Sequence, residues 1–355
     1  MGFINLLLDV QAWPNGVWET IIGWFFSFIG NYGWTILVFT LALKIAMLPI
    51  DYLQRVMTRK TMEQQAIIKP QMDALTAKYG NNKDMLNQKQ MELYKKEKIS
   101  PLGSCFGMLI SLAITLFVFI TLFSSFNNIS HVRIQYEFEQ LRIEYENVYN
   151  LEDNNVEEAQ TAVVAKYGEI KEGWLWIQNI WRPDTPWTSV FPSFEEYVTV
   201  SGTNFSSYTE ETPYVSLNGT EYTDAETAKV AYNLDYSAIT AGINTEYSGP
   251  NGYLILVILS GVVTFLSQYF ATLGAKSKNK KGEDVKSATQ NNKAMLIVLP
   301  IVMIVFTVWY SAAFALYILV SSGIMILFNY LINLVINLAN KHKSKDIKVV
   351  DYSRK

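Results

Sequence analysis

The sequence predicts an all-α polytopic membrane protein with five transmembrane helices, its N-terminus outside the cell and its C-terminus in the cytoplasm. Three observations lead to this fold class. Only 17% of the 355 residues are charged, whereas about a quarter of the residues are charged in an average soluble domain. Several apolar blocks approach or exceed the roughly 20 residues that a helix needs to cross a bilayer. Basic residues cluster between these blocks, as they do on the cytoplasmic side of membrane proteins.

Three of the apolar blocks each predict one span, and the last block predicts two. The single spans come from residues 33–50, 105–126 and 252–273. Residues 294–339 would form a helix of about 69 Å, roughly twice the thickness of the hydrocarbon core. We therefore expect this block to reverse at Trp309-Tyr310-Ser311, since Trp and Tyr prefer the headgroup level of a membrane.

The orientation follows from the lysines and arginines. Residues 55–98 hold ten of them, residues 276–293 six and residues 341–355 six, and five spans place these three segments on the same side. In contrast, residues 127–250 carry six basic and twenty acidic residues, a local charge of −14. We therefore expect the basic segments to be cytoplasmic and residues 127–250 to lie outside.

The predicted organisation has ten parts. They are an outer-interface amphipathic segment (1–32), the first span (33–52), a cytoplasmic helical hairpin (53–102), the second span (103–126), an extracytoplasmic loop or small domain (127–250), the third span (251–273), a cytoplasmic loop (274–293), the fourth span (294–310), the fifth span (311–339) and a basic cytoplasmic tail (340–355). Helical spacing of apolar residues from Trp18 to Ile29 predicts the interfacial helix, with a short extra span as the alternative.

The predicted hairpin is rich in methionine. It contains five of the chain's eleven methionines, namely Met57, Met62, Met72, Met85 and Met91, and its two arms meet near Gly80-Asn81-Asn82. Methionine is flexible and polarizable, so a Met-rich helical surface adapts to many apolar partners. The hairpin is therefore a candidate for capturing apolar substrates, and the alternative is that the methionines only pack its two arms.

Lys44 is the main candidate for a functional residue inside the membrane. It lies ten residues after Trp34 and eleven before Arg55, which puts it near the bilayer midplane. A lysine at that depth costs roughly 2.5 to 3.5 kcal/mol on insertion scales and usually faces a bundle interior or a water-filled cavity. Asp51 is about 10 Å further along a straight helix, so we expect Lys44 to lack a counter-charge on its own helix. Snorkelling to the interface is the alternative.

Polar residues recur at helical spacing on the other predicted spans. Together with Lys44 they define a predicted substrate groove, whose other members are Thr40, Ser111, Thr115, Thr264, Gln268, Tyr317 and Ser321. If these side chains converge on Lys44, they form a hydrated, positively charged groove within the membrane. Such a groove suits an acidic polypeptide segment that must cross the bilayer. The alternative for each hydroxyl is an ordinary hydrogen bond between helices.

The residue inventory argues against cofactor chemistry. The chain has one cysteine and two histidines far apart in sequence, which leaves few ways to build a metal or haem site. It contains no H-E-x-x-H, P-loop or G-x-S-x-G motif. We therefore expect no enzyme activity, no cofactor and no metal. A net charge of −3 gives no sign of recognition of a specific nucleic-acid sequence.

Several short motifs resemble the YidC-type family of membrane protein insertases, which has mitochondrial and chloroplast relatives. The resemblance covers residues 33–126 and 251–337 in the family's order. It rests on Lys44-Ile45-Ala46-Met47-Leu48-Pro49, Lys69-Pro70-Gln71-Met72, Leu93-Tyr94-Lys95, Ser100-Pro101-Leu102-Gly103-Ser104-Cys105, the segment from Gly261 to Gln268, the start of the fourth span at Lys293-Ala294-Met295 and Leu316-Tyr317.

The resemblance implies an insertase and chaperone that works without nucleotide hydrolysis in the bacterial plasma membrane. It implies nascent membrane proteins as substrates, the lipid bilayer as receiver, and the ribosome and the Sec translocon as partners. Thr40 and Tyr317 stand at positions that contact substrate in the family. The basic residues 341–355 resemble ribosome-binding tails, and binding of anionic lipid is equally compatible.

The sequence departs from the family pattern in three places. Lys44 replaces the usual arginine, which keeps the charge and loses the planar fork of five donors. Tyr310-Ser311-Ala312-Ala313 stands where the family has Phe-Pro-Ser-Gly, and residues 127–250 are longer than the bacterial pattern. The rival function is a secondary transporter or channel with Lys44 as substrate or ion site, although no paired inverted repeat supports it.

Overall fold

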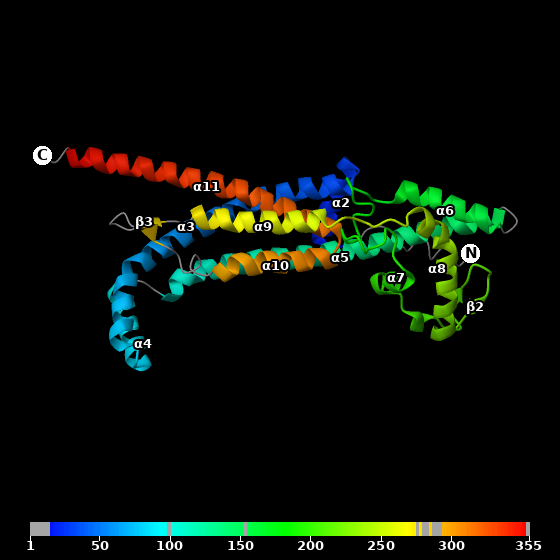
Figure 1. Ribbon diagram of the computed structural model, residues 1–355, viewed down its shortest axis with the longest axis horizontal. Coiled ribbons are helices and arrows are strands. Elements are labelled where there is room, and N and C mark those ends of the chain that lie inside the picture. Colours follow the sequence, from blue (N-terminus) through cyan, green and yellow to red (C-terminus); the bar gives the residue numbers. More distant parts are fainter. Residues whose placement is uncertain are drawn as a thin grey trace. The chain divides into compact units, whose positions relative to one another are not determined.

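A computed structural model describes residues 15–97, 101–151, 155–274, 277–278, 284–285 and 293–352. The described chain is mostly helical (Figure 1). Three of its helical segments are long and apolar enough to cross a membrane: Tyr32–Gln54, Ala113–Leu151 and Ala312–Ile332. Shorter apolar helices lie at Val17–Ile29, Ile255–Ala271 and Pro300–Trp309. The chain is therefore a helical membrane protein, and its five spans and orientation stay predictions.

The chain folds as two compact units. Unit 1 comprises Met1–Phe39, Thr121–Ile258 and Val305–Tyr317, and unit 2 comprises Thr40–Ile120, Leu259–Ile304 and Ile318–Lys355.

Two helices of unit 2 build the segment that was predicted as a hairpin. Helix α3 (Tyr32–Tyr79), which starts in unit 1, runs without interruption from the first predicted span into the first arm of this segment, although Pro49 and Pro70 lie inside it. Helix α4 (Lys83–Lys96) follows, and the side chain of Asn82 caps it by accepting a hydrogen bond from the Met85 amide, 3.1 Å away. The chain thus reverses at the predicted Gly80-Asn81-Asn82 turn.

The remaining long helices are α5 (Pro101–Leu151), α9 (Ile255–Gly274), α10 (Lys293–Trp309) and α11 (Ala312–Tyr352), and α10 contains Pro300. A two-residue antiparallel hairpin, β3 (Ser277–Lys278) with β4 (Asp284–Val285), follows α9. Helix α5 continues 25 residues beyond the predicted end of the second span at position 126. It continues because residues 127–151 contain no Gly or Pro and place apolar residues at helical intervals that are buried in unit 1.

Residues 127–250, called the loop domain below, have an aromatic core within unit 1. Its elements after α5 are α6 (Val156–Ile170), α7 (Phe194–Ser201), the 3₁₀ turn η1 (Phe205–Ser207), the antiparallel pair β1 (Tyr214–Val215) and β2 (Glu221–Tyr222), and α8 (Ala225–Glu246). Phe138 on α5 lies with its ring centre 4.7 Å from those of Tyr197 and Tyr236. Aromatic rings dominate this core because each buries a large apolar area.

Helix α2 (Val17–Ile29) covers the start of α3 in unit 1 and ends at Gly30, whose φ of 72° is the left-handed conformation common at helix ends. The indole N–H of Trp18 donates to Thr121 Oγ1 at 2.9 Å, and Phe26 stacks on Tyr32. Trp24 and Phe28 on its other face are exposed. Helix α2 thus packs one apolar face on α3 and leaves large apolar side chains exposed, and its place at the outer interface stays a prediction.

Residues 179–184 of the loop domain accept hydrogen bonds from backbone amides at the starts of α9 and α11. Asp184 accepts hydrogen bonds from the backbone amides of Tyr253 and Leu256 at 2.8 and 2.6 Å, at the start of α9. The amides of Ala312 and Ala313, at the start of α11, donate to the carbonyls of Arg182 and Ile180. These bonds satisfy amides that have no partner within their own helix.

Candidate functional site

Lys44 lies on α3 and is half-buried, and Thr40, one turn before it, is fully buried. Asp51, two turns later, is 9% exposed, and its charge acts on the Lys44 ammonium group. The absence of a direct ion pair between the two side chains, expected from their spacing of about 10 Å along a straight helix, stays a prediction. The long lysine side chain can cover part of that distance, and Pro49 between the two residues interrupts regular helical hydrogen bonding.

The polar stripe on α9 is turned inward. Ser260 and Thr264 are buried, and Gln268 is half-buried. The hydroxyl of Thr264 lies 2.9 Å from that of Ser322 on α11, at hydrogen-bond distance. This hydroxyl therefore links two helices of unit 2, which is the alternative role considered for it from the sequence. Ser321, the residue predicted from its spacing, is half-buried, and its neighbour Ser322 makes this contact instead.

The other predicted groove residues lie in different surroundings. Thr115 on α5 is exposed, and the side chain of Ser111 lies outside the described residues. Tyr317 belongs to unit 1, where it is buried and its ring centre lies 5.6 Å from that of Phe126. Within unit 2 the structure thus joins Thr264 to α11, and convergence of the whole set on Lys44 stays a prediction.

The methionines of α3 and α4 differ in exposure. Met85 and Met91 on α4 are 41% and 53% exposed, and Met57 and Met72 on α3 are half-buried. The side chain of Met62 lies outside the described residues. Among the side chains of these two arms that the structure describes, the buried apolar ones are Ile68 and Leu93, and the α4 methionines lie at the surface.

The departure from the family pattern at positions 310–313 has a structural counterpart. Helix α10 ends at Trp309 and α11 begins at Ala312. The α11 amides of Ala312 and Ala313 reach backbone carbonyls of the loop domain at 2.8 and 2.9 Å. This reversal is thus held by backbone hydrogen bonds, which do not depend on the residue types at these positions.

An ionic cluster at the base of the loop domain was missed by sequence reasoning. Glu137 is fully buried, and Asn179 Nδ2 donates to its Oε2 at 3.0 Å. Glu172 pairs with Arg133 and accepts from the indole N–H of Trp181. Burial raises the pKa of Glu172, against the opposing effects of Arg133 and Trp181. Glu137 and Arg133 are four residues apart on α5, and this i,i+4 spacing was the available signal.

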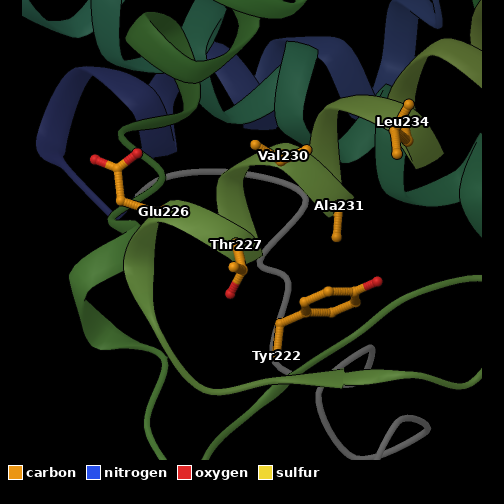
Figure 2. Close-up of a pocket in the computed structure, with 6 residues that line it drawn as sticks. All are labelled: Tyr222, Glu226, Thr227, Val230, Ala231 and Leu234. Atoms are coloured by element: carbon orange, nitrogen blue, oxygen red, sulfur yellow. The ribbon is translucent and has the colours of Figure 1, made fainter.

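A hollow of about 270 Å³ lies on the surface of the loop domain (Figure 2). It is mostly apolar and is lined by Tyr222 on β2 and by Glu226, Thr227, Val230, Ala231 and Leu234 on α8. Glu226 is the only charged residue of this lining, so the hollow lacks the paired acid and base of a hydrolytic site. Among the described residues there is also no group of three or more His, Cys, Asp or Glu placed to hold a metal ion.

Comparison with known proteins gives one consistent result. A family model described as "60Kd inner membrane protein" matches residues 24–340. Similar curated proteins are named membrane protein insertase YidC. The protein of Pseudoalteromonas atlantica is 38% identical over 99 residues, which cover 28% of this chain and 18% of the relative. That of Aromatoleum aromaticum is 34% identical over 103 residues, covering 29% and 17%. That of Thioalkalivibrio sulfidiphilus is 32% identical over 124 residues, covering 35% and 20%. The matched part thus spans about a fifth of the length of these relatives.

Proposed function

Because this chain belongs to the 60Kd inner membrane protein family, we propose that it inserts nascent membrane proteins into the lipid bilayer and assists their folding. The proposal extends to this chain what the name of its relatives says of them. It places the protein in the bacterial plasma membrane, with the N-terminus outside and the C-terminus in the cytoplasm. The ribosome, reached through residues 341–355, and the Sec translocon are proposed partners.

The observation that carries the mechanism is a half-buried lysine within an apolar helix. Lys44 lies in the segment Tyr32–Gln54, which is long and apolar enough to cross a membrane. A cation at such depth costs roughly 2.5 to 3.5 kcal/mol and is usually retained for a function. Asp51 on the same helix acts electrostatically on Lys44. An acidic group of a substrate can take over that role.

In the proposed mechanism, Lys44 and the polar residues of α9 form a hydrated groove open to the cytoplasm. An acidic segment of the substrate enters this groove while its apolar segment moves into lipid. The exposed Met85 and Met91 offer the first contact for the apolar segment. A membrane potential, negative inside, adds about 2.3 kcal/mol per acidic charge per 100 mV in the outward direction. No nucleotide hydrolysis and no covalent step are required.

The test is insertion of a short single-span protein with an acidic translocated tail into liposomes that contain this protein. Wild type and Lys44→Arg are expected to insert it, and Lys44→Ala is expected to insert it at least tenfold more slowly. Lys78→Ala, which removes a cation at the end of α3 outside the apolar segment, serves as the matched control. A second substrate with a neutral tail should depend less on Lys44.

Each outcome bears on a different part of the proposal. Unchanged insertion by Lys44→Ala would remove Lys44 from the mechanism and leave the insertase function in place. Absence of insertion by wild type would refute the proposed function. In that case solute flux through the same liposomes would test the rival transporter reading.

A further inference from the structure

Helices α9 and α11 approach each other closely at one point in unit 2. The hydroxyls of Thr264 and Ser322 lie 2.9 Å apart. A Cβ atom at Gly323, the next residue of α11, would lie 3.9 Å from Val263 Cγ1, which is ordinary van der Waals contact. Small residues such as Gly and Ser allow this approach between membrane helices. We call the contact surface of these two helices the seam.

Two polar side chains extend the seam beyond this point. Gln268 follows Thr264 by four residues on α9, and Asn329 follows Ser322 by seven residues on α11. These spacings return each side chain to the same face of its helix. Asn329 is 2% exposed, and its Oδ1 is buried, as is Nε2 of Gln268. By this spacing, each residue lies on the same helix face as the residue of its own helix in the Thr264–Ser322 contact.

The two helices run in the same direction (Figure 1). Gln268 and Asn329 therefore lie on the same side of the Thr264–Ser322 bond. At 1.5 Å per residue they are about 6 and 10.5 Å beyond it, an axial offset of about 4.5 Å. This offset is within the reach of the two side chains together with one small group between them.

Both buried atoms lack a hydrogen-bond partner among the residues that the structure describes. Nε2 of Gln268 is a donor and Oδ1 of Asn329 is an acceptor. An unsatisfied polar group in an apolar environment costs several kcal/mol, so such groups are normally paired. The seam thus presents one donor and one acceptor to a group that enters it.

The chemistry of the two atoms selects the kind of group that fits. With the two amides oriented as in the structure, a carboxylate would satisfy Gln268 Nε2 and be repelled by Asn329 Oδ1, and an ammonium group would do the reverse. A peptide group satisfies both, because its carbonyl accepts and its N–H donates. We propose that Gln268 and Asn329 bind one backbone peptide group of a polypeptide in transit, with Gln268 Nε2 donating to the carbonyl and Asn329 Oδ1 accepting from the N–H.

This inference rests on the proposed function and specifies how a substrate is held. A backbone contact does not depend on substrate side chains, so it suits a protein whose substrates differ in sequence. A polypeptide that is not yet helical has unpaired backbone groups, which are costly inside the membrane. The contact would give one of these groups a hydrogen-bond partner. Gln268 is half-buried, so part of its side chain is accessible although its Nε2 atom is buried.

The test uses a short single-span peptide in which one amide at a time is replaced by an ester, which lacks the N–H. Affinity for the full-length protein in liposomes is measured by fluorescence of a label on the peptide. With wild type, an ester at one position is expected to weaken binding about tenfold relative to the amide, and neighbouring positions should have little effect. With Asn329→Leu, the amide peptide binds about tenfold more weakly and the ester causes no further loss.

Three further variants separate a binding role from a structural one. Gln268→Met should weaken binding of the amide and ester peptides alike and leave their ratio unchanged. Asn329→Asp, which keeps an acceptor oxygen, should restore the effect of the ester. Ser267→Ala, which removes a hydroxyl of the same helix that belongs neither to the predicted groove nor to the Thr264–Ser322 contact, should leave the amide-to-ester ratio at its wild-type value.

The outcomes distinguish this inference from the function on which it rests. If wild type binds and inserts the peptide but tolerates the ester at every position, the pair holds only a water molecule and the inference is refuted. An ester effect of the same size in wild type and Asn329→Leu also refutes it. If wild type neither binds nor inserts the amide peptide, the proposed function itself fails.

Discussion

Removal of the Asp184 carboxylate is expected to release the first turn of α9. Asp184 is fully buried and accepts hydrogen bonds from the amides of Tyr253 and Leu256 at 2.8 and 2.6 Å. A hydrogen bond to a charged group contributes about 1.5 to 3 kcal/mol. In Asp184→Ala both amides lose their partner, so the free energy of local opening should fall by at least about 3 kcal/mol. This corresponds to amide exchange that is roughly 100-fold faster, since 1.4 kcal/mol is a factor of ten.

The assay is hydrogen exchange by mass spectrometry on the full chain in lipid nanodiscs. Exchange should accelerate in the peptide that spans Tyr253–Leu256 and stay unchanged in α6, whose cap is Asn155. Asp184→Asn keeps one acceptor oxygen and should give an intermediate rate. Unchanged protection at Tyr253 and Leu256 in Asp184→Ala would show that other contacts hold this turn, and the reasoning would be wrong.

Three further predictions concern other parts of the molecule. Gly252→Ala should destabilise the first turn of α9, because the added Cβ would lie 1.9 Å from Asp184 Oδ1. Thermal unfolding followed by tryptophan fluorescence should then show a lower midpoint temperature, and an unchanged midpoint would contradict this. Partial burial alone would raise the pKa of Glu196, but the charge of Arg182 and hydrogen bonds from Arg182 and Ser193 outweigh it and lower this pKa. The ionised Glu196 carboxylate therefore stabilises the fold above pH 4.5. This stabilisation is lost as the pH falls through the lowered pKa of the folded protein. Thermal unfolding between pH 5.5 and 3.5 should therefore change less in Glu196→Gln than in wild type, and equal pH dependence would argue against the ion pair. Met91→Ser should slow insertion of strongly apolar substrates a few-fold in the liposome assay and leave the thermal midpoint unchanged, because this side chain is exposed; equal rates would exclude it from substrate capture.

The membrane class and the family could be predicted from the sequence. Apolar blocks separated by basic segments are a strong signal, because a helix in lipid must satisfy every backbone group internally. The family resemblance predicted from the motifs is confirmed by the match over residues 24–340. The helix reversal after Trp309 was also visible, because a single helix would have been too long for a bilayer.

The tertiary contacts were harder to predict. Spacing identifies the face of a helix on which a residue lies, but it does not identify the neighbour of that face. The sequence therefore singled out Ser321, whereas Ser322 bonds to Thr264. Asn329 drew no attention because it lies in a strongly apolar segment, and its burial became evident only in the structure. The electrostatic influence of Asp51 on Lys44 depends on side-chain reach, which residue spacing along a straight helix does not include.

Helix α3 runs from the apolar segment into the methionine-bearing arm, so it fixes the directions of the side chains in these two parts relative to each other. Lys44 and Met57 belong to one helix of 48 residues, so the direction of each side chain about the helix axis is set by the number of residues between them. Each residue turns the helix by about 100°. One alanine inserted after Tyr52 would therefore rotate the Met57 face by about 100° relative to Lys44. Seven inserted residues would restore its direction within about 20° while extending the arm by about 10 Å. In this helix, length and orientation are thus two separately adjustable properties.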